Sequence, residues 1–104
     1  MATTFAAKSV LGELLTSHRD EIYLLAAEQH ARNVRVFGSV SRGEDRTDSD
    51  IDLLVDFDDE SHPLDILALG CALEELLGRR VDLCSVSGLR PSARDEILNQ
   101  AIAL

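Results

Sequence analysis

Two aspartates interrupt an otherwise apolar stretch near the middle of the chain. Asp50 and Asp52 stand in DIDLLVDF, where Ile51, Leu53 and Val55 are apolar. Residues two apart on a strand point to the same face, with Cα atoms roughly 6.6 Å apart at about 3.3 Å per residue. Two adjacent carboxylates repel each other, and partial burial adds a desolvation cost. A divalent cation such as Mg²⁺ is the simplest partner for such a pair.

A third acid occurs in a similar apolar setting further along the chain. Asp82 lies between Val81 and Leu83 in RRVDLCSV. If its strand runs parallel beside the strand of Asp50 and Asp52, we expect the three carboxylates to meet. Carboxylates grouped in this way hold two metal ions about 3.5–4 Å apart in two-metal phosphoryl-transfer sites. The pattern therefore predicts a magnesium site that serves nucleotidyl transfer.

A glycine–serine pair precedes the acids. Gly38 and Ser39 follow the apolar end of VRVF, and Arg42 lies one helical turn later. A glycine after a strand lets a phosphate approach the backbone closely, and the N–H groups and the Ser39 hydroxyl can donate hydrogen bonds to its oxygens. Arg42 is placed to neutralise phosphate charge. These residues predict a turn that binds phosphate oxygens and forms the other half of the site.

Each of these features also has a simpler explanation. The acids lie in a segment rich in aspartate, and Asp82 could form a surface pair with a neighbouring arginine. Ser39 could cap a short helix without binding phosphate. Arg42 is balanced between a phosphate contact and a surface pair with Glu44 or Asp45. The joint occurrence of the glycine–serine pair and all three acids favours the site.

Hydrophobic periodicity predicts the elements that must position these side chains. The expected order is helix, strand, strand, helix, strand, helix. Ser17 and Asp20 read as a capping box that opens the second half of the first helical region. Pro63 suits a first helical position and Gly78 a C-cap. The expected helices span residues 5–15, 17–31, 63–77 and 92–102, and the expected strands span 34–37, 50–57 and 80–86.

The connections between these elements predict the fold class. A long crossover joins the second and third strands and favours a parallel pair, whereas the short link between the first and second favours an antiparallel or skewed pair. The chain is therefore expected to be a single α/β or α+β domain over residues 1–104. Its small mixed sheet should have about three to four strands flanked by helices.

Composition limits the function further. The 104 residues are 45% hydrophobic and carry a formal net charge of −9, with Lys8 as the sole lysine. This charge argues against autonomous nucleic-acid binding. It suits a basic protein partner or a metal site, and it is equally consistent with a role in solubility alone. No apolar run of bilayer length or signal peptide is recognised, so a cytoplasmic protein without membrane contact is expected. Cys71 and Cys84 have no metal-ligand spacing and are expected to be buried.

The combined motifs resemble a known superfamily. An apolar residue with Gly-Ser, a loop, and then Asp-apolar-Asp-apolar is the signature of the polymerase β-like nucleotidyltransferases. The runs FGSVSRGE, SDIDLLVDF and RVDLCSVSGLRPSARDEIL look more closely like the minimal nucleotidyltransferase (MNT) family. This similarity extends over nearly the whole chain, from about residue 8 to 104, and no motif residue is missing.

The resemblance implies a nucleotidyltransferase fold and specific roles. Gly38 and Ser39 would hold a nucleoside triphosphate, ATP by preference, while Asp50, Asp52 and Asp82 would bind Mg²⁺. Many members of that family are encoded by a gene that neighbours the gene of a HEPN-domain ribonuclease toxin, and they act as its antitoxin. Some do so by transferring AMP from ATP to a tyrosine of the toxin. The resemblance thus implies a protein adenylyltransferase with a HEPN partner. Two alternatives remain: an antitoxin that only masks its toxin, and a nucleotidyltransferase acting on RNA ends, which the scarcity of lysine disfavours.

Overall fold

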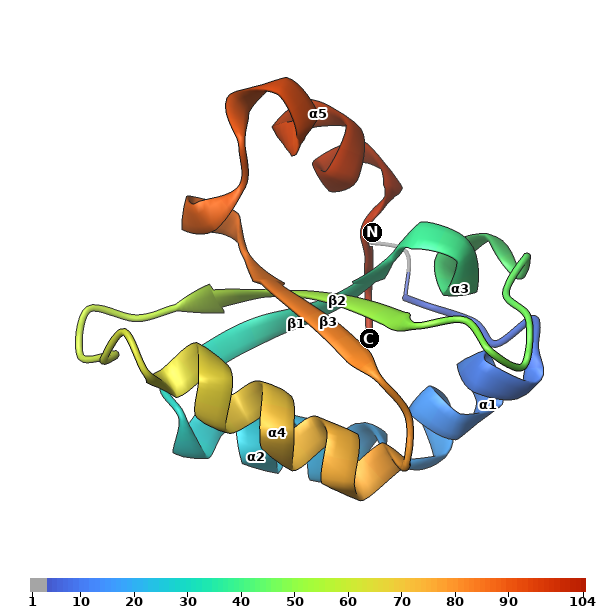
Figure 1. Cartoon of the computed structure of the whole chain (residues 1–104), viewed down its shortest axis with the longest axis horizontal. Helices are drawn as coiled ribbons and strands as arrows, with labels where there is room; N and C mark the ends of the chain where they lie inside the picture. The colour runs from blue at the N-terminus through green and yellow to red at the C-terminus, as the bar shows by residue number, and fades with distance from the viewer. Residues whose placement is uncertain (1–3) are drawn as a thin grey trace.

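A four-stranded mixed sheet organises the structure, a computed structural model that describes residues 4–104 (Figure 1). The strands lie in the order β3-β2-β1-β4. They are β1 (Ala31–Phe37), β2 (Ile51–Phe57), β3 (Val81–Ser85) and β4 (Ile102–Ala103). The helices are α1 (Val10–Ser17), α2 (Arg19–Glu28), α3 (Gly38–Arg42), α4 (Asp65–Leu77) and α5 (Pro91–Gln100), with a 3₁₀ turn, η1 (Val86–Gly88). No helix among these residues is both long and apolar enough to cross a bilayer.

The strand directions confirm the predicted topology. β2 pairs antiparallel with β1, to which it is joined by α3 and a loop, and parallel with β3, to which it is joined by α4. The register of the parallel pair places Asp52 beside Asp82. β4 adds to the far side of β1 in antiparallel orientation. The predicted α/β architecture with a small mixed sheet is therefore confirmed.

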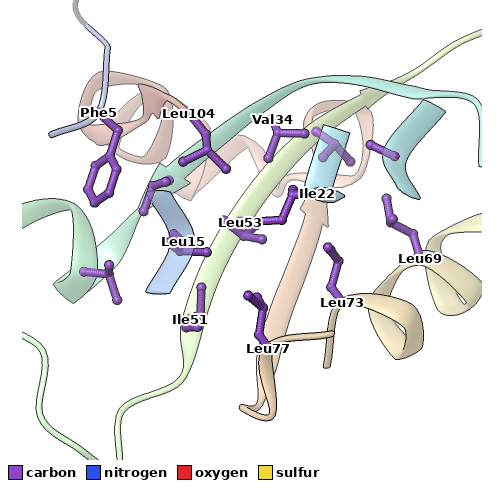
Figure 2. Close-up of a cluster of buried hydrophobic side chains, with 14 of the residues drawn as sticks. Phe5, Leu15, Ile22, Val34, Ile51, Leu53, Leu69, Leu73, Leu77 and Leu104 are labelled. Carbon is purple, nitrogen blue, oxygen red and sulfur yellow. The ribbon is translucent and has the colours of Figure 1, made fainter. Parts of the chain in front are cut away.

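The hydrophobic core lies on one face of the sheet. Ile51, Leu53 and Val55 of β2 have no solvent exposure and belong to the core cluster, together with side chains of α1, α2 and α4 (Figure 2). In Figure 1, α2 and α4 lie on this side of the sheet and α5 lies on the other. Because side chains alternate along a strand, Asp52 and Leu54 point to the face opposite the core. The strand is thus anchored from one side and presents its acids on the other.

The first helix begins later than the periodicity predicted. Phe5 lies in an extended segment, where it is buried and donates its N–H to the Ala103 carbonyl at 2.6 Å. Ser9 caps α1 by accepting a hydrogen bond from the Gly12 N–H at 3.1 Å. The prediction of a helix from residue 5 was wrong because a side-chain cap and a sheet contact fix the chain before Val10.

The predicted capping box at Ser17 and Asp20 is also wrong. The Ser17 hydroxyl instead donates to the Leu14 carbonyl at 2.9 Å, one turn back along α1. His18 occupies the position between α1 and α2, and no side chain caps α2 there. The hydroxyl is already used by a carbonyl at the C-terminal end of α1, so it does not cap the N-terminus of α2.

The other element boundaries shift by a few residues. β1 begins at Ala31, because Asn33 adopts a positive φ of 54° inside an irregular stretch of the strand instead of preceding it. α4 begins at Asp65, two positions after Pro63, which belongs to the preceding turn. The left-handed Gly78, with φ of 65°, ends α4 as predicted.

The end of the chain departs most from the prediction. The last helix begins with Pro91 and ends at Gln100, and the following residues form β4 instead of continuing the helix. Leu104 is 1% exposed, donates its N–H to the Val34 carbonyl at 2.9 Å, and accepts a hydrogen bond from the Arg19 guanidinium. The apolar residues after Gln100 thus complete the sheet and the core.

We expect Leu104→Ala to lower the free energy of unfolding by about 2–5 kcal/mol, because it removes a buried aliphatic side chain. Urea denaturation measures this loss. Leu24→Ala is the control, since Leu24 is 66% exposed on α2 and surface changes usually stay within about 0.5 kcal/mol. Equal stabilities of the two variants would contradict the packing of Leu104.

Candidate active site

Two of the predicted acids meet where β2 and β3 run side by side. Asp52 and Asp82 are register partners on neighbouring strands, and the negative charge of Asp82 acts on the carboxyl group of Asp52. Asp50 stands just before β2, and one of its carboxylate oxygens lies 3.8 Å from Nε of Arg80. Asp50 and Asp82 are exposed, whereas Asp52 is half-buried between them. The structure therefore brings Asp52 and Asp82 together on neighbouring strands, with Asp50 just before β2 and Asp52 as the most enclosed of the three acids.

The environment of Asp52 raises its pKa to about 6. Burial is the largest cause, because desolvation disfavours the charged carboxylate, and the negative charges of Asp82 and Asp50 act in the same direction. The positive charge of Arg42 opposes them. Asp52 thus sits where a further cation would relieve an unfavourable accumulation of negative charge.

The turn after β1 presses directly against this carboxylate. Gly38 has a positive φ of 72°, and a Cβ atom built on it would lie 2.1 Å from Oδ2 of Asp52. Only glycine allows both the backbone conformation and the contact. The preceding residue, Phe37, is the register partner of Asp52 across the antiparallel pair. The structure therefore brings the predicted glycine–serine turn directly beside Asp52.

The side chains of α3 divide into those used within the fold and those that face outward. The Ser41 hydroxyl donates to the Gly38 carbonyl at 2.6 Å and is buried, so it stabilises the turn itself. Ser39 is half-buried, and its hydroxyl makes no hydrogen bond to another residue of the 4–104 segment. This leaves the Ser39 hydroxyl available to a ligand next to Asp52.

Arg42 makes the surface pair that was one of its two predicted alternatives. Its Nε donates to the Glu44 carboxylate at 2.9 Å, and its Nη1 donates to Oε1 of Gln100 at 3.0 Å. Its charge still reaches Asp52, as the pKa of that acid shows. The contact with Gln100 could not be predicted from the sequence, because it depends on how α5 packs against α3.

The acids form no complete metal cage by themselves. Across the described residues, 4–104, no group of three or more His, Cys, Asp or Glu is placed to hold a metal ion, and the partner of the Asp50 carboxylate is the Arg80 guanidinium. The carboxylate oxygens of Asp52 and Asp82 nevertheless match the ligands of Mg²⁺, which commonly takes one or two carboxylates together with waters and substrate phosphates. The donor set fits magnesium.

The two cysteines differ in their surroundings. Cys84 is half-buried on β3, and burial together with the charges of Asp82 and Asp52 raises the pKa of its thiol. It therefore borders the site in its neutral form. Cys71 is exposed on α4, so the prediction that both cysteines are buried was wrong for this residue.

Comparison with known proteins identifies the class to which this fold and site belong. The sequence profile of the family described as "Polymerase beta, Nucleotidyltransferase" matches residues 21–104. The protein adenylyltransferase MntA of Thermococcus cleftensis is 39% identical over 86% of this chain and 87% of its own length. The chain therefore belongs to the polymerase β nucleotidyltransferase family, which confirms the predicted enzyme class.

Solved structures agree with this assignment. The chain is 50% identical to a minimal nucleotidyltransferase, with a TM-score of 0.80 and coverage of 88% of this chain and 94% of that one. This similarity confirms the predicted relation to the minimal members of the family. A structure of a toxin–antitoxin with AMP-PNP shares the fold, with 23% identity, a TM-score of 0.69, and coverage of 81% and 69% of the two chains.

The raised pKa of Asp52 predicts a specific pH dependence of stability. The folded protein keeps the Asp52 proton up to about pH 6, whereas the unfolded chain loses it near about pH 4. Between these values the folded state binds more protons, so this residue makes stability fall as pH rises. In metal-free protein, Asp52→Asn should therefore gain stability relative to the wild type across this window. Parallel pH profiles of the two proteins in urea denaturation would contradict the placement of Asp52.

We expect Gly38→Ala to damage the site more than the fold. The new methyl group must displace the Asp52 carboxylate or the turn, and left-handed backbone costs roughly 1–2 kcal/mol for a residue with a Cβ. NMR titration of Asp52 should then give a pKa closer to its ordinary value, because the carboxylate moves into solvent. The matched control is Gly70→Ala on α4, where a Cβ would meet nothing within 4 Å. An unchanged Asp52 pKa in Gly38→Ala would be inconsistent with the contact.

Proposed function

We propose that this protein is a Mg²⁺-dependent protein adenylyltransferase of the cytoplasm. It would transfer AMP from ATP to a hydroxyl group of a HEPN-domain ribonuclease toxin and so act as an antitoxin. The observation that carries this proposal is the Asp52–Asp82 pair held against the Gly38 turn. That arrangement places a pair of acids, whose mutual repulsion a cation would relieve, beside the backbone of the glycine–serine turn.

Two comparisons support the choice of donor and acceptor class. The similar chain from Thermococcus cleftensis is named a protein adenylyltransferase, and its similarity spans most of both chains. The toxin–antitoxin structure that shares the fold contains AMP-PNP, an analogue of ATP. These names favour ATP and a toxin partner over a nucleic-acid acceptor, in agreement with the net charge of −9.

Each site residue has a role in this proposal. The backbone N–H groups at Gly38 and Ser39, with the Ser39 hydroxyl, bind and orient the phosphates. Asp50, Asp52 and Asp82 would hold Mg²⁺. When bound, the ion supplies positive charge that offsets the triphosphate and the developing charge of the leaving group. Arg42 contributes further positive charge once phosphate competes with Glu44 for its guanidinium.

The transfer itself is an in-line substitution at the α-phosphorus. The acceptor oxygen forms a new bond to phosphorus, the bond from the α-phosphorus to the α–β bridging oxygen breaks, and pyrophosphate leaves with that oxygen. The hydroxyl proton passes to the carboxylate of Asp82, which is exposed and open to an incoming acceptor. Rate enhancement comes mainly from positioning and from charge stabilisation, as in other phosphoryl transfers.

The decisive experiment mixes the protein, Mg²⁺ and α-labelled ATP with the product of the neighbouring gene. We expect label on that protein, located by mass spectrometry. Asp52→Asn should reduce transfer by at least about a hundredfold, the scale on which a preorganised charged group contributes to catalysis. Asp56→Asn is the matched control, because Asp56 lies on the same strand but pairs with Arg35 at 2.9 Å. Equal transfer by wild type and Asp52→Asn would refute the proposal.

The same variants separate modification from masking. If the protein neutralises its partner by transfer, cells that express the neighbouring gene's product should lose protection when they carry Asp52→Asn. If Asp52→Asn still protects these cells while transferring no label, the protein acts as a non-catalytic antitoxin that covers its partner.

A further inference from the structure

The outer side of β3 is the edge of the sheet that lies nearest to the acids. β3 ends the sheet, and within residues 4–104 no strand pairs with its outer side. The Arg80 carbonyl accepts a hydrogen bond from the Ile51 N–H of β2, so the alternate residues Val81 and Leu83 direct their backbone groups outward. The Val81 N–H is taken by the Glu74 carboxylate at 3.1 Å. The open backbone positions therefore continue from Leu83 onward.

A groove runs between this edge and α4. It has a volume of about 310 Å³, and its lining includes Leu67, Gly70 and Cys71 of α4 and Asp82 of β3. Leu67 is 65% exposed, although it is a large apolar side chain. A Cβ at Gly70 would meet nothing within 4 Å, so the helix leaves room for a side chain from outside. The groove thus combines an unpaired strand edge with an apolar wall.

We infer that this groove docks an extended segment of the acceptor protein, which pairs with β3 as an added strand. The inference rests on the proposed function, because it names how the acceptor reaches that site. Asp82 lines the groove and is also the register partner of Asp52, so the groove runs along the strand that carries one of the acids. A strand added there passes alongside Asp82, which is where the acceptor hydroxyl is needed.

The groove also defines the chemistry of that segment. Side chains of an added strand alternate between the two faces of the sheet. One set lies over α4 and contacts Leu67, so it is apolar, while the other set lies on the face of the acids and includes the hydroxyl. The charged groups that line the groove, Glu74 and Asp82, are both acidic, and the chain carries −9 overall. The docked acceptor segment is therefore expected to alternate apolar and polar residues and to carry positive charge.

The test compares Leu67→Lys with Leu24→Lys. The two leucines are 65% and 66% exposed and lie on different helices, α4 and α2. Leu67→Lys should weaken binding to the neighbouring gene's product and transfer to it by at least about tenfold. Its affinity for AMP-PNP and its unfolding temperature should stay at wild-type values. Leu24→Lys should match the wild type in all four measurements.

Footprinting of Cys71 gives a second measurement. Cys71 is exposed on the groove wall, so a maleimide should label it in the free protein, and the acceptor should protect it in the complex. Mass spectrometry distinguishes this label from one on Cys84. The docking site would be overturned if the acceptor also protected Cys71 in Leu67→Lys, or if Leu67→Lys still transferred label at the wild-type rate. The proposed function would remain intact in both cases.

Two further outcomes are decisive. If the wild-type protein neither binds nor labels the neighbouring gene's product, the proposed function and the docking inference both fail. If Leu67→Lys changes the oligomeric state of the protein in size-exclusion chromatography but leaves transfer unchanged, a second copy of this chain occupies the groove, and the acceptor docks elsewhere.

Discussion

The contact between the Gly38 backbone and the Asp52 carboxylate is the constraint on which the site depends. A half-buried carboxylate beside two other acids is unfavourable, as its pKa of about 6 records. It stays in place because its strand is fixed from the other side by Ile51, Leu53 and Val55, all fully buried. Each such side chain contributes about 1.5–3 kcal/mol on burial. The core can therefore sustain a local repulsion that a ligand would relieve.

The same core determines the register of the acids. A slip of one residue in β2 would move Ile51, Leu53 and Val55 to the solvent face and carry Asp52 into the core. The parallel register with β3 then follows from α4, whose Leu69, with no exposed surface, belongs to the same cluster. The Asp52–Asp82 pairing is thus a consequence of hydrophobic packing on the opposite face of the sheet.

This dependence explains which features the sequence could predict. The alternation of acids and apolar residues is a local pattern. It therefore sufficed to predict which face of β2 is buried and that Asp50 and Asp52 lie close together. The strand at Ile102 could not, because it exists only where β1 offers a free edge. The Arg42–Gln100 contact likewise joins two helices far apart in sequence. The predicted cap at Ser17 was wrong for another reason. The end of α1 and the start of α2 compete for the same hydroxyl, and it bonds to α1.

The two sides of the acid site differ in how open they are to ligands. α3 covers one side of the acids, and Arg42 ties it to α5 through Gln100, so this side is closed by the fold and suits phosphates that bind backbone N–H groups. The other side is β3, an edge strand. Because Asp82 is the acid on that strand and Asp52 lies on the next one, whatever approaches from the open edge meets Asp82 before Asp52. A nucleotide donor held at the Gly38–Ser39 turn and an acceptor arriving along the β3 edge would therefore face each other across the acids. A basic acceptor segment would also reduce the charge repulsion that helps to raise the pKa of Asp52.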